Sequence, residues 1–174
     1  LAIVKGLPRE DLSHEEFRLL SWAIGLKAGV VRPQGMASQY IAAVRDIGTN
    51  YRAANGRGYS SSAKLDFHVD GADLTTLTCY NKAKSGGQSM ISSGVTARNY
   101  LVKERPDLAE VASQYFYFSR QSEQASDETP FYGQPLFDEE NGHLFCKWNR
   151  NRVQSAQNLK GVPKLSDAQK ETME

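Results

Sequence analysis

Short runs of β-branched and aromatic residues, separated by turn-forming residues, recur along most of this chain and limit the folds open to it. The segment from Lys64 to Tyr80 alternates and is rich in Thr, Leu and aromatic residues around Asp70-Gly71-Ala72-Asp73, which predicts two strands joined by a turn. After Ser85-Gly86-Gly87 the chain turns again. Other runs of this kind predict strands at residues 2–4, 41–47, 88–92, 115–119 and 143–153.

Helices are predicted between these strands. Ser13 and Glu16 have the spacing of a capping box, and an apolar face at helical spacing follows until Gly25 or Gly29. Ser93 or Thr96 is expected to cap a helix over residues 97–104, with a second helix over 106–112 and another beginning near 165. The sequence therefore predicts a mainly β architecture with flanking helices, of the α+β class.

Composition limits the number of domains, the kinds of partner and the location that we expect for the protein. The 174 residues are 40% hydrophobic and 24% charged, which suits one globular domain spanning residues 1–174. The 21 basic and 20 acidic residues nearly balance, so nothing favours nucleic acid or an anionic membrane as a partner. No run approaches the roughly 20 apolar residues of a membrane span. Cys79 and Cys146 are too few and too far apart for a disulfide framework, which favours a reducing, cytoplasmic location.

The residues with the clearest chemical meaning are His68 and Asp70, in the segment Leu65-Asp66-Phe67-His68-Val69-Asp70. Residues two apart on a strand project to the same face, so an imidazole nitrogen and a carboxylate oxygen would reach one point. Such a pair suits a divalent transition metal, above all iron(II) held by two histidines and one carboxylate. A strand-end histidine hydrogen-bonded to a nearby aspartate is the ordinary structural alternative.

Around this pair the chain resembles a known family, and the similarity extends along most of its length. The matching segments are Val4-Lys5-Gly6-Leu7, Val44-Arg45-Asp46-Ile47, Tyr59-Ser60-Ser61, Phe67-His68-Val69-Asp70, Leu77-Thr78-Cys79-Tyr80, Ala83-Lys84-Ser85-Gly86-Gly87-Gln88-Ser89, Asn99-Tyr100-Leu101, Arg105-Pro106-Asp107-Leu108, Pro135-Leu136-Phe137 and Trp148-Asn149-Arg150. In their order and spacing these segments resemble the taurine dioxygenase family within the clavaminate-synthase-like group of 2-oxoglutarate enzymes.

The resemblance implies a double-stranded β-helix, or jelly roll, whose sheets enclose the metal. His68 and Asp70 match the first two iron(II) ligands of the family. Ser89 falls where the family often carries Thr and where a hydroxyl helps to hold the distal carboxylate of 2-oxoglutarate. The implied activity is oxidation of an aliphatic C–H bond of a small-molecule substrate by iron(II), 2-oxoglutarate and O2, with release of succinate and CO2.

The third ligand of the family, a second histidine, and the arginine that pairs with 2-oxoglutarate have no match here. His143 with Arg152 imitates their spacing, but its surroundings resemble an earlier hairpin of the family, so we expect His143 to be a surface residue beside a turn. We expect residues 1–174 to be the N-terminal and central part of one dioxygenase domain. A further polypeptide segment or companion chain would then complete the jelly roll, because exposed sheet edges are avoided in folded proteins.

Two other functions stay open on the sequence. A jelly-roll module that has lost a ligand would bind a small molecule or partner without turnover. A zinc hydrolase would also use His and carboxylate ligands, but no second His or general base has the required spacing. The sequence does not choose among substrates, and it leaves open assembly as a homo-oligomer. Polar residues in regions that approach substrate in the family, with solvated loops as the alternative, are Arg45, Tyr51, Arg52, Asn55, Lys64 and Gln88.

Overall fold

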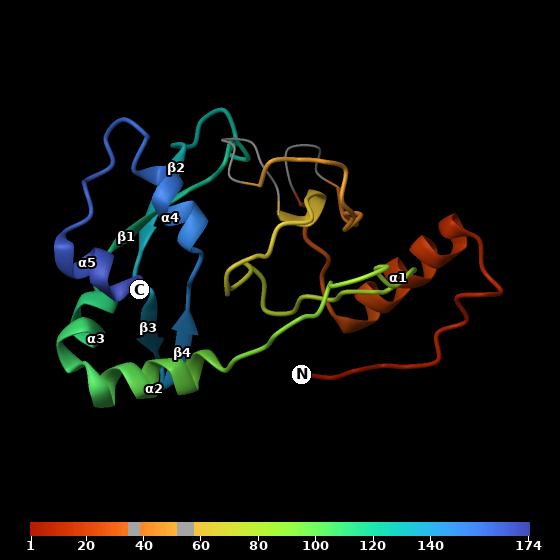
Figure 1. Ribbon diagram of the computed structural model, residues 1–174, viewed down its shortest axis with the longest axis horizontal. Coiled ribbons are helices and arrows are strands. Elements are labelled where there is room, and N and C mark those ends of the chain that lie inside the picture. The colour runs from red at the N-terminus through yellow and green to blue at the C-terminus, as the bar shows by residue number, and fades with distance from the viewer. Residues whose placement is uncertain (35–38, 52–57) are drawn as a thin grey trace. The chain divides into compact units, whose positions relative to one another are not determined.

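A computed structural model of the chain describes residues 1–34, 39–51 and 58–174. The chain divides into two compact units, each built from two segments of the sequence. The first unit comprises Leu1–Ala42 and Ala72–Ser89, and the second comprises Ala43–Gly71 and Met90–Glu174. The described residues form the elements labelled in Figure 1, namely α1 (His14–Ala28), η1 (Gly58–Ser60), α2 (Gly94–Glu104), α3 (Pro106–Ala112), β1 (Phe116–Ser119), β2 (Phe131–Gln134), β3 (Phe137–Glu140), β4 (His143–Cys146), α4 (Arg150–Ala156) and α5 (Asp167–Thr172).

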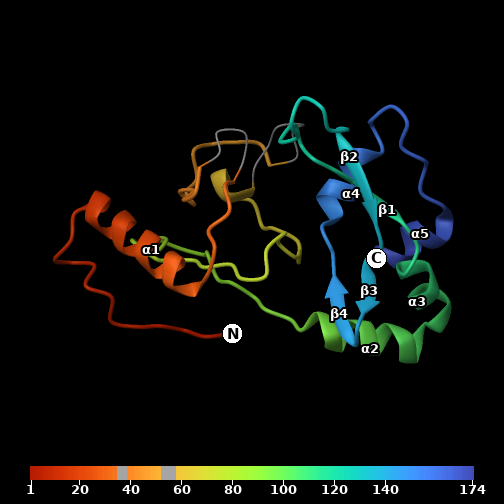
Figure 2. The same cartoon turned by 180° about the vertical axis from the view of Figure 1, so that it is seen from behind.

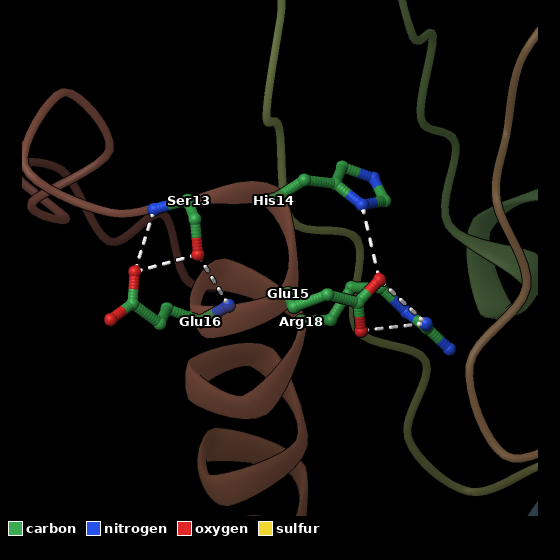
Figure 3. A network of polar contacts seen from close by, with 5 residues as sticks. All are labelled: Ser13, His14, Glu15, Glu16 and Arg18. Carbon is green, nitrogen blue, oxygen red and sulfur yellow. Dashed lines mark hydrogen bonds and ion pairs between the residues drawn. The ribbon is translucent and has the colours of Figure 1, made fainter.

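In the first unit the main element is α1, and its start is fixed by the predicted capping box. The Ser13 hydroxyl accepts from the backbone N–H of Glu16 at 3.3 Å, and the Glu16 carboxylate accepts from the backbone N–H of Ser13 at 2.8 Å (Figure 3). This exchange satisfies amide groups that a helix start otherwise leaves unpaired. The helix ends at Gly29, the second of the two glycines predicted to stop it.

The second unit contains the hydrophobic core. β1 and β2 form one antiparallel pair, and β3 and β4 form another. Phe116 and Phe118 of β1 and Val153 of α4 have no exposed surface, so the helix covers the inner face of the strand. The remaining buried members of this cluster are Ala112, Leu136 and Met173. Their burial supplies the main free energy that holds the unit together.

Two glycines shape the elements around the β3–β4 hairpin. Asn141 and Gly142 both have positive φ, 53° and 76°, which is the conformation of a tight hairpin turn and is easiest for Asn and Gly. Gly94 begins α2, and a Cβ there would lie 3.3 Å from Cys146 at the end of β4. The absence of a side chain at Gly94 therefore lets α2 approach the hairpin closely, as seen from both sides in Figure 1 and Figure 2.

Polar contacts attach α5 to the same core. Arg105, between α2 and α3, donates to Asp107 at 2.7 Å and to Glu171 of α5 at 2.8 Å, and the Arg105 guanidinium lowers the pKa of Asp107. Gln169 donates from its side chain to the carbonyl of Tyr115 at 3.1 Å. The helix predicted to begin near residue 165 is thus confirmed, with Ser166 as its cap.

Several predicted strands are wrong. Within the described residues, no strand forms at 2–4, 41–47 or 88–92, and residues 64–80 contain one isolated bridge at His68 in place of two strands. The 41–47 segment pairs its amides differently, since the backbone N–H groups of Arg45 and Ile47 donate to the carbonyls of Tyr59 and Ser60, both within η1. By contrast, the structure confirms the 115–119 strand and the 106–112 helix, and it begins the predicted 97–104 helix three residues early, at Gly94.

The strand predicted over 143–153 is correct only as far as Cys146. Asn149 ends the extended stretch because its side chain accepts from the backbone N–H of Arg152 at 3.0 Å and so caps α4. Asn is among the best residues for this role. Arg150 and Arg152 therefore lie on a helix. None of the described helices is long and apolar enough to cross a membrane.

The capping box generates a prediction about Glu16. The Ser13 hydroxyl and backbone N–H stabilise the Glu16 carboxylate and hold its pKa below the ordinary value, so this stabilisation is present above the ordinary Glu pKa and is lost as pH falls through the lowered one. We expect Ser13→Ala to raise the Glu16 pKa toward its ordinary value in an NMR titration, and Ser13→Thr to keep it low. An unchanged pKa in Ser13→Ala would exclude the hydroxyl as a cause.

Candidate functional site

The segment that carries His68 and Asp70 is tied to the core of the second unit. The backbone N–H of Val69 donates to the carbonyl of Trp148 at 2.7 Å, and His68 lies opposite Asn149 in an antiparallel bridge. Trp148 in turn packs against the buried cluster around Phe116 and Phe118. A segment without strand neighbours of its own thereby acquires a fixed place beside the end of β4.

The structure brings the two predicted ligands together. His68 Nε2 lies 3.8 Å from Asp70 Oδ1, and the two side chains are 37% and 58% exposed. This is the arrangement expected for residues two apart on an extended chain. Both side chains are therefore partly exposed to solvent.

The His68 ring is oriented by the backbone two residues before it. Its Nδ1 lies 2.8 Å from the carbonyl oxygen of Asp66. A carbonyl oxygen can only accept, so this contact favours a proton on Nδ1, and a neutral ring in that tautomer has its lone pair on Nε2, the atom nearer to Asp70. Metal-ligating histidines commonly use their other nitrogen in this way.

The pair fits two positions of a site for a divalent metal. Two ligand atoms that each lie about 2.1 Å from an ion, at right angles, are about 3.0 Å apart. The observed 3.8 Å separation requires only a small movement of an exposed carboxylate. Within residues 1–34, 39–51 and 58–174, no cluster of three His, Cys, Asp or Glu side chains is placed to hold a metal. The described part of the chain thus offers His68 and Asp70 as two candidate ligands.

The other predicted site residues lie elsewhere. Ser89 is exposed and lies outside any helix or strand, in the first unit, just after Gly86 and Gly87. His143 is exposed beside the turn of the hairpin. Arg152 donates to the carbonyl of Ser119 at 3.3 Å and to the Glu123 carboxylate at 3.2 Å, so its guanidinium is already used within the fold.

Of the polar residues that we expected near a substrate, four can be placed. Arg45, Lys64 and Gln88 are exposed and Tyr51 is half-buried. Arg52 and Asn55 lie outside the described residues.

Both cysteines are free, and burial raises the pKa of the Cys146 thiol.

Sequence reasoning missed the contribution of the backbone around the pair. The carbonyl of Asp66 orients the ring of His68, and Asn149 supports the bridge opposite it. The preference of Asn for helix starts could have located α4, but no local pattern reveals that residues 68 and 149 pair.

Comparison with known proteins decides the family. The family described as "Taurine catabolism dioxygenase TauD, TfdA family" matches residues 1–172. The chain belongs to this family. It is 29% identical to FR-33289 synthase of Streptomyces rubellomurinus over 149 residues, which cover 85% of this chain and 44% of that protein. It is also 29% identical to the taurine hydroxylase-like protein SAT17 of Stachybotrys chartarum over 84 residues, which cover 48% of this chain and 21% of that protein.

Membership of the taurine catabolism dioxygenase family confirms the resemblance found in the sequence. The chain spans less than half the length of the curated relatives it matches. The match therefore establishes kinship with dioxygenases, and the activity of the whole protein is a separate question.

The contact between His68 and Asp66 generates a prediction for the metal-free protein. We expect the neutral His68 ring to carry its proton on Nδ1, because only a protonated Nδ1 can donate to the Asp66 carbonyl. Nitrogen-15 NMR of the imidazole distinguishes the two tautomers. His14 and His143, which make no such backbone contact among those described, serve as internal references. A His68 ring protonated on Nε2 would contradict the geometry.

Proposed function

We propose that the protein is an iron(II)- and 2-oxoglutarate-dependent dioxygenase that oxidises an aliphatic C–H bond of a small molecule and releases succinate and CO2. The observation that carries this proposal is the approach of His68 Nε2 to Asp70 Oδ1 at 3.8 Å, with the histidine lone pair directed by the Asp66 carbonyl. Family membership over residues 1–172 supports the same chemistry.

In this proposal each residue has a limited task. His68 and Asp70 bind the metal through one nitrogen and one oxygen and leave other positions for 2-oxoglutarate and oxygen. Ser89 contributes a hydroxyl to the distal carboxylate of 2-oxoglutarate. When bound, iron with 2-oxoglutarate and O2 supplies the oxidising power, while the protein supplies orientation and excludes water.

The proposal requires more polypeptide than these residues. We propose that a second histidine and an arginine, on a further segment or a companion chain, complete the ligand set and the jelly roll. The 44% coverage of FR-33289 synthase supports this. In the second unit, exposed apolar side chains of the kind that folded proteins bury support it too, among them Val95, Tyr100 and Phe145, which are 54%, 68% and 54% exposed.

Two free cysteines suit a reducing compartment, and we propose that the protein is located in the cytoplasm. The substrate stays unassigned within the class of small molecules.

Turnover tests the proposed function. We expect the full-length protein, loaded with iron(II) without oxygen and then exposed to O2, to convert 2-oxoglutarate to succinate, and His68→Ala and Asp70→Ala to lose at least about 100-fold of this activity, since each removes a direct ligand of the metal. His143→Ala is the matched control, because this exposed histidine lies beside the hairpin turn, and it should retain activity.

Two results would contradict the proposal. Equal activity in His68→Ala and His143→Ala would remove His68 from the metal site. Failure of the wild-type protein to bind iron(II) or to consume 2-oxoglutarate with a panel of small molecules would favour the ligand-binding module without turnover.

A further inference from the structure

Asn149 takes part in two structural features, the bridge to His68 and the cap of α4. Its backbone lies opposite His68 in the antiparallel bridge, beside the Val69–Trp148 hydrogen bond of 2.7 Å. Its side chain accepts from the backbone N–H of Arg152 at 3.0 Å and caps α4. The residue therefore joins the metal-ligand segment to the start of a helix.

The helix that Asn149 caps is firmly held. Val153 and Ala156 of α4 are fully buried, and the helix packs along β1. In its first turn Arg152 contacts the Ser119 carbonyl and the Glu123 carboxylate. The start of α4 thus has a fixed position within the second unit.

The pairing of His68 with Asn149, at the start of α4, is supported by few other contacts. It is an isolated bridge and not part of a ladder, so among the described residues only the hydrogen bond from Val69 to Trp148 also holds the register if residue 149 moves. Asn149 is extended, with φ −159° and ψ 96°. A capping residue keeps this non-helical conformation while its side chain bonds into the first turn. The cap and the bridge therefore require the same backbone conformation at one residue.

We propose that Asn149 is a positioning residue for the metal pair. By capping α4 it holds its own backbone extended, and that backbone fixes the place of His68. This inference rests on the proposed function and extends it to a residue that touches neither metal nor substrate. Outer partners of metal ligands commonly change metal affinity by about 10- to 100-fold when removed.

The experiment compares caps of two helices in the full-length protein. Asn149→Ala removes the cap of α4, and Asn149→Asp retains an acceptor of the same length. Ser93→Ala is the matched control, because Ser93 caps α2 of the same unit by accepting from the Thr96 N–H at 3.2 Å, away from His68 in the sequence and without a part in the bridge. Asn149→Gly is a second test should the alanine variant fail to fold, since glycine costs a helix start little stability.

Two measurements are made on these variants. The first is hydrogen exchange of the Val69 amide in the metal-free protein, where we expect about 10-fold faster exchange in Asn149→Ala and wild-type exchange in Asn149→Asp and Ser93→Ala. The second is the dissociation constant for iron(II), measured without oxygen. We expect it to rise about 10-fold in Asn149→Ala and Asn149→Gly and to stay near wild type in the other two.

The outcomes distinguish the positioning role of Asn149 from the proposed function of the protein. If wild type binds iron(II) but Asn149→Ala and Ser93→Ala weaken binding equally, the effect is one of general stability and the positioning role is overturned while the proposed function stands. Wild-type exchange at Val69 in Asn149→Ala also overturns it. If the wild-type protein binds no iron(II), the proposed function fails and the positioning role fails with it.

Discussion

One backbone hydrogen bond, from Val69 to Trp148, connects the chemistry of this chain to its fold. His68 and Asp70 lie on an extended segment that forms no strand within the described residues, so their position depends on what that segment touches. Through the bond of 2.7 Å it touches Trp148, which packs on the core around Phe116 and Phe118. The hydrophobic burial that stabilises the second unit thereby also locates the two candidate ligands.

Around this hydrogen bond, the position of His68 is set mainly by contacts of backbone groups. The Asp66 carbonyl sets the orientation of the His68 ring, and the change from strand to helix at Asn149 sets the backbone opposite it. Such supporting contacts orient the two candidate ligands in the absence of a metal, and in metal sites generally this lowers the cost of organising the site on binding.

Local signals in the sequence were sufficient for some elements and insufficient for others. The capping box at Ser13 and the proline at the start of α3 act within a few residues, so both helices could be predicted. Residues 41–47 and 64–80 have the composition of strands, but a strand needs a partner, and composition does not identify one. The partner of His68 is Asn149, distant in sequence, and the helix start at Asn149 was hidden by the strand-like apolar and aromatic residues just before it. For the site, the spacing of His68 and Asp70 predicted that they would meet, while the roles of the Asp66 carbonyl and Asn149 depend on tertiary contacts that spacing does not encode.

X-ray absorption at the iron edge tests most directly whether His68 and Asp70 are iron ligands. The full-length protein would be loaded with iron(II) without oxygen, alongside His68→Ala and His143→Ala. We expect His68→Ala to lose one imidazole from the iron shell, or to lose the iron, and His143→Ala to match the wild type. An unchanged iron shell in His68→Ala would show that the metal is bound elsewhere and would contradict this assignment of the ligands.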